Sequence, residues 1–518
     1  MFARIKVSGP RKYLQIVENF REGNKVKQRV IITVGRIDLL EGTGRIDSLI
    51  KCLSRFADKV KVVDLMGGGL TGGVVKKIGP DLIIKRLWEE LGINEVIGGL
   101  LNGRRYGFEV ERAIYFTVLS RLFFPGSDRK ALRVSRDYKI EGKEGLDLHH
   151  FYRAMAWLGE SKDEIEEGLF LRSRDLFTGV NLVFFDTTSI YFEGNGGESL
   201  GQYGYSKDRR SDERQMIVGA VIDSVGRPIS CPMWPGNMAD SKTLIPLIER
   251  LKERFGVGDI VIVADRGMVS KETVGELEDL GVGYIFGVKM RKEKEAKGEV
   301  LSRAGKYREV KDNLKVKEVQ IEGRRYIVCL NPEEAERDRA EREAIRESLR
   351  RKLKEGAKAL IGNRGYRKYL KIEKTSIEID EEKIKSEERF DGKYVLRTNT
   401  SLLAEEVALR YKELWQVERI FREVKSVLET RPIYHKYDST IKGHVFCSFL
   451  ALVVMKELIR RVDFKAEWDE IRQDLDSLYE TEIRLDSKGY LLRSKLQGVC
   501  GKLFKSVGVA IPPLVAHL

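Results

Sequence analysis

Three carboxylates that lie far apart in the chain are the residues whose surroundings point most clearly to chemistry. Asp186 follows the apolar run LVFF, and Asp265 follows the apolar run IVIVA. Each run reads as a buried strand that ends in an aspartate. Glu418 lies in a third stretch, residues 405–443, whose first two thirds read as an amphipathic helix. Three carboxylates that converge repel one another unless a cation lies between them.

The chemistry that such a cluster could perform is phosphodiester cleavage. Hard oxygen ligands suit Mg²⁺ or Mn²⁺. Two such ions can activate a water or hydroxyl and stabilise the leaving oxygen. Each aspartate taken alone is more often a turn or N-cap residue, and Glu418 alone is more often part of a solvated helix face. The combination of two strand–Asp runs with this helix is what favours a catalytic site.

The helix that carries Glu418 is expected to present one polar stripe. Tyr411, Leu414, Glu418 and Lys425 are separated by 3, 4 and 7 residues. At about 100° per residue in one continuous α-helix, these four positions fall within a stripe roughly 60° wide. The stripe would place a phenol, a carboxylate and an ammonium on one face.

The two aspartates must be positioned by the region 181–290. Its pattern predicts three antiparallel strands, then a helix, a strand, a helix and a strand, which is a mixed-sheet α/β layout. Asp186 is expected at the end of the first strand and Asp265 at the end of the fourth. Strand ends that meet at one edge of such a sheet are where ligands collect.

The composition narrows the class of partner and the compartment. The chain has 518 residues, a net charge of +14 and a pI of about 9.3, so a polyanion is expected, nucleic acid being the commonest. Its five cysteines are widely spaced and never form a CxxC pair, which indicates a reducing compartment and no structural zinc. The N-terminus has no signal-peptide pattern, and the apolar run 445–455 is too short to span a bilayer. Cytoplasm is the expected location.

Five regions are expected along the chain. The pattern predicts a small N-terminal β-containing module with a hairpin, then a helical region for DNA binding or dimerisation, a catalytic α/β core in two segments, a β-rich insertion that divides the core, and a helical C-terminal tail. In the same order, their residues are 1–70; 71–178; 179–290 and 395–460; 291–394; and 461–518.

The order Asp186, Asp265, Glu418 resembles the DDE transposases of bacterial and archaeal insertion sequences. The helix resembles the Tyr-Arg-Glu-Lys signature of one large group of them. Tyr411, Glu418 and Lys425 match three of its positions, and Leu414 stands where that group has Arg. The resemblance covers roughly residues 180–450 and includes the runs GYSKDRRSDERQMIVGAVIDSVGRPI, WPGNMADSKTL, VIVADRGM and RFDGKYVLRTN.

This resemblance implies an RNase H-like core that is interrupted by the β-rich insertion. It also implies an enzyme that binds the terminal inverted repeats of its own insertion sequence, cuts them with Mg²⁺ (Mn²⁺ substituting) and joins the ends to target DNA. A homodimer on double-stranded DNA is expected. Asp186, Asp265 and Glu418 would hold the metal ions. The residues expected to contact DNA are Tyr411, Lys425, Arg422, Arg419, Lys207 and Arg210.

Two alternatives stay open from the residues alone. One is a nuclease on the same core that cuts without joining. The other is a catalytically inactive DNA-binding protein derived from a transposase, which the departure at Leu414 keeps possible.

Overall fold

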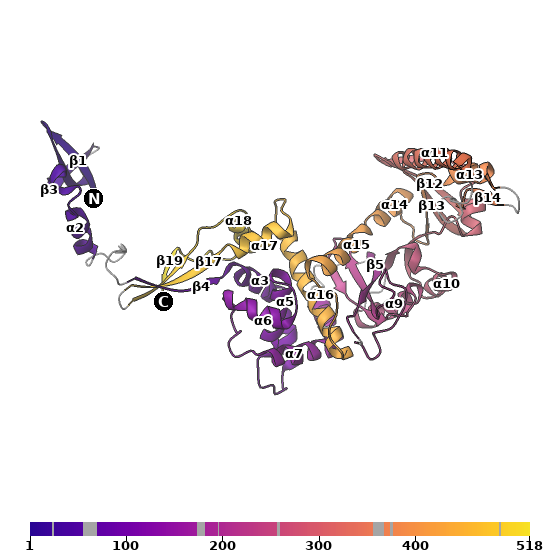
Figure 1. Ribbon diagram of the computed structural model, residues 1–518, viewed down its shortest axis with the longest axis horizontal. Coiled ribbons are helices and arrows are strands. Elements are labelled where there is room, and N and C mark those ends of the chain that lie inside the picture. The colour runs from indigo at the N-terminus through magenta and orange to yellow at the C-terminus, as the bar shows by residue number, and fades with distance from the viewer. Residues whose placement is uncertain are drawn as a thin grey trace. The chain divides into compact units, whose positions relative to one another are not determined.

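The computed structural model describes residues 1–22, 25–54, 70–172, 182–194, 196–255, 260–355, 367–372, 377–485 and 488–518. The chain divides into two compact units. The first comprises Met1–Val75, Thr481–Arg493 and Pro513–Leu518, and the second comprises Lys76–Glu480 and Ser494–Pro512. Among the described residues, no helix has both the length and the apolar character that a membrane crossing requires. Figure 1 labels the elements along the chain.

The first unit is built mainly from β-strands. Strands β1 (Phe2–Ser8), β2 (Arg11–Glu22) and β3 (Lys25–Arg36) form an antiparallel sheet, which confirms the predicted hairpin. Two short helices follow, α1 (Ile37–Leu40) and α2 (Arg45–Ser54).

A second sheet draws on both ends of the chain. Strands β17 (Tyr479–Leu485), β18 (Lys488–Arg493) and β19 (Val515–His517) join β4 (Leu70–Lys77) in the order β19-β18-β17-β4. The region expected to be a helical tail therefore contains strands beside α17 (Trp468–Asp476) and α18 (Cys500–Val507).

Helices dominate the next region, as the sequence predicts. Helix α5 is buried on all sides from Ala113 to Phe123, so it forms the centre of this group. The helices are α3 (Gly79–Glu90), α4 (Ile93–Leu101), α5 (Val110–Phe123), α6 (Asp128–Val134), α7 (Leu148–Glu160) and α8 (Lys162–Arg172).

The catalytic region is organised by a mixed sheet of ten strands in the order β11-β12-β13-β16-β10-β9-β5-β6-β7, with β8 paired to β6. Strands β5, β9 and β10 are parallel, and the other pairs are antiparallel. The first core segment contains β5 (Leu182–Tyr191), β6 (Gln215–Asp223), β7 (Pro228–Ser230), β8 (Met233–Pro235), α9 (Leu244–Phe255), β9 (Val261–Ala264), α10 (Lys271–Asp279) and β10 (Gly283–Gly287).

This order confirms the predicted mixed α/β layout. One detail differs, because the expected third strand is divided into β7 and β8. Pro232 lies at the division, and a proline has no backbone N–H to continue a ladder.

The insertion extends the core sheet. Strands β11 (Arg308–Lys311), β12 (Leu314–Ile321) and β13 (Arg324–Leu330) continue it through β16 (Lys393–Thr398). The insertion also contains the 24-residue helix α11 (Pro332–Glu355), the strand pair β14 (Leu370–Ile372) and β15 (Ile377–Ile379), and α13 (Glu381–Glu387).

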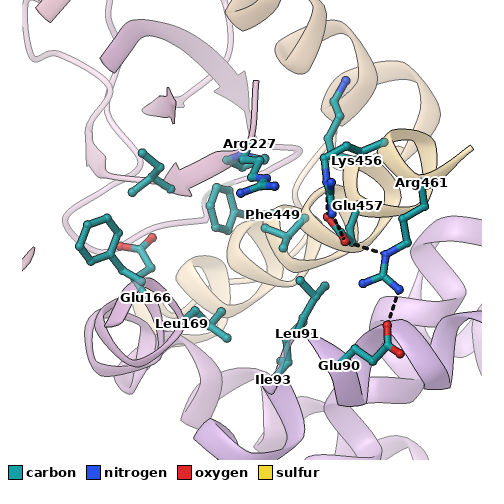
Figure 2. Close-up of a pocket in the computed structure, with 15 residues that line it drawn as sticks. Glu90, Leu91, Ile93, Glu166, Leu169, Arg227, Phe449, Lys456, Glu457 and Arg461 are labelled. Atoms are coloured by element: carbon teal, nitrogen blue, oxygen red, sulfur yellow. Dashed lines mark hydrogen bonds and ion pairs between the residues drawn. The ribbon is translucent and has the colours of Figure 1, made fainter. Parts of the chain in front are cut away.

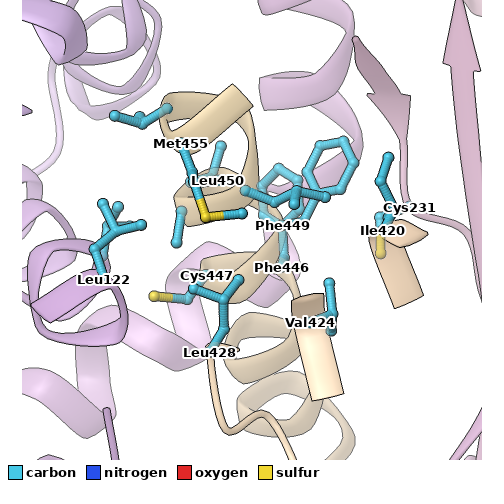
Figure 3. Packing of buried hydrophobic residues seen from close by; sticks show 14 of the residues in the cluster. Leu122, Cys231, Ile420, Val424, Leu428, Phe446, Cys447, Phe449, Leu450 and Met455 are labelled. Carbon is cyan, nitrogen blue, oxygen red and sulfur yellow. The ribbon is translucent and has the colours of Figure 1, made fainter. Parts of the chain in front are cut away.

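The two faces of the sheet are covered by different helices. Phe184 and Ile190 of β5 share an apolar cluster with α15 (Trp415–Arg422) and α16 (Asp438–Arg461), whereas Phe185 shares a cluster with α9 and α10. Alternate residues of a strand point to opposite faces, so the even-numbered residues of β5 face α15 and α16. Figure 3 shows Phe446, Phe449 and Leu450 of α16 packed between Leu122 of α5 and Ile420 of α15.

The expected continuous helix over the Glu418 region is wrong. The chain forms α14 (Ala404–Lys412), a turn at Glu413 and Leu414, α15, and then a π-helical segment, η8 (Glu423–Val427). Across the turn the backbone bonds span three residues, as from Leu414 N–H to Tyr411 O at 3.1 Å and from Val417 N–H to Leu414 O at 3.0 Å. Leu414 is only 7% exposed, so its burial in the core accompanies the break.

Candidate active site

The two aspartates lie side by side on neighbouring parallel strands. Phe185 of β5 pairs with Ala264 of β9, so Asp186 and Asp265 are the next residues of the two strands. Val263 belongs to the same apolar cluster as Phe184, and both point to the α15 face. Because side chains alternate along a strand, Asp186 points to the same face as Phe184. Asp265 lies one residue past the end of β9 and points to the same face as Val263. The predicted position of Asp265 is confirmed, whereas Asp186 lies in the middle of β5 rather than at its end.

The electrostatics of Asp186 reflect this crowding. Burial raises the pKa of Asp186 to about 6, and the neighbouring carboxylates of Asp265 and Asp240 act in the same direction. The Lys207 ammonium and a hydrogen bond from the Thr187 backbone N–H (2.7 Å) oppose the rise in pKa. The site therefore concentrates negative charge that a cation would stabilise.

Asp240 is a carboxylate of this site that was not among the residues predicted from the sequence. It begins a short 3₁₀ turn (Asp240–Lys242) whose N-cap residue is Ala239. Its Oδ1 accepts a hydrogen bond from Thr187 Oγ1 at 2.8 Å, and its Oδ2 lies 3.2 Å from Lys207 Nζ. The signal available in the sequence was its place in the run WPGNMADSKTL, which resembles the transposase family as a whole.

Lys207 reaches into the carboxylate cluster. Its Nζ lies 3.9 Å from Asp186 Oδ1 and donates to the Thr187 carbonyl at 2.6 Å. The sequence predicted a DNA contact for this residue, and the structure brings it to the aspartates instead.

Asp265 is held from the other side by Tyr411 of α14. The phenol donates a hydrogen bond to Asp265 Oδ1 at 3.0 Å. Burial raises the pKa of Tyr411 above its usual range, so the phenol keeps its proton and remains a donor. A Cβ at Gly287 would lie 2.4 Å from the Tyr411 hydroxyl, so this approach depends on glycine there. The phosphate contact expected of Tyr411 stays a prediction.

Glu418 lies on α15, which packs over β5 and β6 on the face that Asp186 shares. Val417, Ile420 and Phe421 bury the inner side of this helix, while Glu418 is exposed. The structure thus brings Asp186 and Asp265 into adjacent positions and places Glu418 on a helix that packs against β5 and β6.

Lys425 lies in the π-helical segment η8, which directly follows the helix that carries Glu418. Its ammonium is paired with Asp208, at 2.9 Å and 3.1 Å from the two carboxylate oxygens, and Arg431 also pairs with Asp208 at 2.7 Å. Burial lowers the pKa of Lys425, while Asp208 opposes that fall. Burial acts to raise the pKa of Asp208, but the hydrogen bonds from Lys425 and Arg431 outweigh it and leave that pKa below its usual value.

The other basic residues expected to contact DNA are partly or fully exposed. Arg210 pairs with Asp212 and Glu213 in the loop before β6. Arg419 pairs with Glu423 at 3.1 Å, and Arg422 is exposed at the end of α15.

A separate cavity of about 310 Å³ lies between α3, α4, α8 and α16 (Figure 2). Leu91, Ile93, Leu169 and Phe449 give it an apolar wall, and Arg461 at its rim bonds Glu90. None of the three predicted carboxylates lines it. Its glutamates, Glu90, Glu166 and Glu457, are each paired with arginine or lysine side chains, so the aspartate cluster is the stronger candidate.

The donors at the aspartates are carboxylate oxygens, the type of ligand that a divalent ion of the magnesium class takes. Among the described residues, the group of three potential ligands whose atoms lie within 4.8 Å of one another is a different one, Asp147, His149 and His150. The Lys207 ammonium beside Asp186 and Asp240 shows that the cluster already attracts positive charge.

Comparison with known proteins identifies two family matches. The model of the transposase DDE domain matches residues 179–454, and the model of the IS1634 family transposase N-terminal domain matches residues 3–63. A search of curated proteins found no match.

Among solved structures, a piggyBac transposase synaptic complex with hairpin DNA is 9% identical over 77% of this chain and 76% of that chain, with a TM-score of 0.35. A Mos1 transposase paired-end complex is 16% identical over 48% of this chain and 70% of that chain, with a TM-score of 0.16. TM-scores this low do not establish a shared fold.

Proposed function

The chain belongs to the transposase DDE domain family, and we propose that it binds the terminal inverted repeats of its own insertion sequence, cuts them and joins the ends to target DNA. The observation that carries this proposal is the adjacent placement of Asp186 and Asp265 on β5 and β9. The match of the N-terminal module to an insertion-sequence family supports the same substrate.

The family is divalent-metal dependent, and we propose Mg²⁺, with Mn²⁺ able to substitute. Asp186, Asp265 and Glu418 would hold the metal. When bound, it would activate the attacking hydroxyl or water and stabilise charge on the leaving oxygen. Tyr411 orients the Asp265 carboxylate through its hydrogen bond.

Double-stranded DNA is the proposed partner. The chain carries a net charge of +14, and the side chains of Arg210, Arg419 and Arg422 are partly or fully exposed. Lys425 would contact a phosphate after leaving Asp208. We propose a homodimer on DNA and a cytoplasmic location, where the five free thiols would stay reduced.

The test uses a duplex that carries the inverted repeat flanking this gene, together with a supercoiled target plasmid. With Mg²⁺, we expect cuts at the repeat ends and covalent joining of the freed 3′ ends to the plasmid. Cutting without joined product would identify a nuclease instead. Repeat binding without any cutting would identify a binding protein.

A further inference from the structure

Two consecutive loop residues bind opposite sides of the active site. Lys207 reaches the aspartates, and Asp208 reaches Lys425 and Arg431. Their loop joins β5 to β6 and contains Arg209 with a left-handed φ of 60°.

The Lys207 ammonium fills a defined gap in the sheet. Gly219 stands opposite Thr187 and donates its N–H away from β5, to Pro232 O at 2.8 Å. In an antiparallel pair this directs the Thr187 carbonyl away from β6, toward the side of β9. Strand β9 ends at Ala264, opposite Phe185, so it offers no partner to that carbonyl. Lys207 donates to it instead at 2.6 Å.

Asp240 and Ser189 hold Lys207 in this gap. The Asp240 carboxylate lies 3.2 Å from Nζ, and the Lys207 backbone N–H donates to Ser189 Oγ at 2.9 Å. Asp186 lies 3.9 Å from the same Nζ. The ammonium therefore neutralises carboxylates that a divalent ion would also neutralise.

Asp208 neutralises two cations in the same way that Lys207 neutralises the carboxylates. Its carboxylate accepts from Lys425 at 2.9 Å and 3.1 Å and pairs with Arg431 at 2.7 Å, with only 15% of its side chain exposed. A phosphate is an anion that lysine and arginine bind through the same kind of charge-assisted bonds. The Asp208 carboxylate therefore occupies the Lys425 and Arg431 side chains, which a DNA phosphate would also bind.

We propose that Lys207 and Asp208 are internal stand-ins for the metal ion and a DNA phosphate, and that both must be displaced before the active site is loaded. This inference rests on the proposed function. It assigns Asp240 as a positioning residue, which holds Lys207 among the aspartates. It also gives the free protein a neutralised site in which the aspartates and the Lys425–Arg431 pair are each satisfied.

The metal arm of the test measures Mn²⁺ binding to the full chain without DNA, by titration calorimetry. Lys207→Met is compared with Lys242→Met, which removes the same charge from an exposed lysine of the 3₁₀ turn. We expect the Lys207 variant to bind Mn²⁺ about tenfold more tightly than the wild type, because a competing charge has been removed, and the Lys242 variant to differ by less than about twofold. Equal or weaker binding by the Lys207 variant overturns the proposal.

The phosphate arm measures the affinity for a short repeat-bearing duplex in EDTA, as a function of salt. Asp208→Asn is compared with Glu198→Gln, which removes the same charge from an exposed residue of the same loop. We expect Asp208→Asn to bind about fivefold more tightly and with a steeper salt dependence, since Lys425 and Arg431 become free to contact phosphate. Equal affinities of the two variants overturn the proposal.

Melting temperature and near-UV circular dichroism establish that each variant is folded, and Lys207→Gln replaces Lys207→Met if the latter is not. The wild type separately tests the proposed function through metal-dependent cutting and joining. If it cuts and joins while the variants match their controls, the stand-in role fails and the transposase assignment stands. If it neither cuts nor joins, the proposed function fails whatever the variants show.

Discussion

Tyr411 donates its phenolic hydrogen to Asp265 Oδ1 at 3.0 Å, which ties helix α14 to the end of strand β9. The sequence suggested that this tyrosine contacts phosphate. The observed bond supports a different role, in which Tyr411 orients a carboxylate that would hold metal.

Removal of this hydroxyl should weaken metal binding more than DNA binding. We expect Tyr411→Phe to lower the Mn²⁺ affinity roughly tenfold, because a partner that orients a metal-binding carboxylate is lost. The affinity for repeat DNA in EDTA should stay within about twofold. Calorimetry and a gel-shift titration measure the two quantities. A large loss of DNA affinity with unchanged Mn²⁺ affinity would restore the phosphate role.

The raised pKa of Asp186 predicts the pH dependence of metal loading. A carboxylate must lose its proton to bind metal, and burial raises the pKa of Asp186 to about 6. The Mn²⁺ affinity should therefore be close to its maximum above about pH 7 and fall as the pH drops through about 6. Calorimetric titrations at a series of pH values measure this fall. An affinity that stays constant down to about pH 4.5 would contradict it.

In its ionised form, Asp186 should lower the free energy of unfolding of the metal-free protein. The folded-state pKa of Asp186 is above its ordinary value of 3.8, so its stabilising contribution is fully present below about pH 3.8 and is lost as the pH rises through about 6. At pH 7 without metal, Asp186→Asn should raise the free energy of unfolding by about 2 kcal/mol. Urea unfolding at pH 7 and pH 4 measures this gain, which should shrink at the lower pH. A destabilised variant at pH 7 would refute the account of Asp186.

Introduction at position 414 of the Arg found in the Tyr-Arg-Glu-Lys group that the helix resembles should damage the protein. Leu414 is 7% exposed and packs in the main core, at the turn between α14 and α15. An arginine there would bury an unpaired charge, so we expect Leu414→Arg to lower the free energy of unfolding by about 3 kcal/mol or more. Leu414→Met, of similar volume, should cost less than about 1.5 kcal/mol. Tighter DNA binding by a fully stable Arg variant would show that this position faces the substrate.

The sequence predicted the core strands well because their signals are local. Apolar runs such as IVIVA form buried strands, and an aspartate after such a run marks its end, as at Asp265. Asp186 was misplaced because β5 continues through Thr187, Thr188 and Ser189, polar residues that lie buried in the sheet.

Other parts of the site depend on tertiary contacts that a sequence does not display. The break at Leu414 follows from burial in the core, which overrides a helical pattern. Asp240 joins the site because Thr187 and Lys207 meet it across the fold. Lys425 pairs with Asp208 from a loop more than two hundred residues earlier in the chain.

The most direct test of the central claim is a cleavage assay on repeat-end DNA with Mg²⁺, using Glu418→Gln beside Glu413→Gln. Glu413 lies in the turn before α15 and pairs with Arg410, so its variant is a matched neutral control. We expect the wild type and Glu413→Gln to cut at the repeat ends, and Glu418→Gln to bind the DNA normally yet cut at least about a hundredfold more slowly. Equal cutting by Glu418→Gln would contradict the assignment of Glu418 to the catalytic centre.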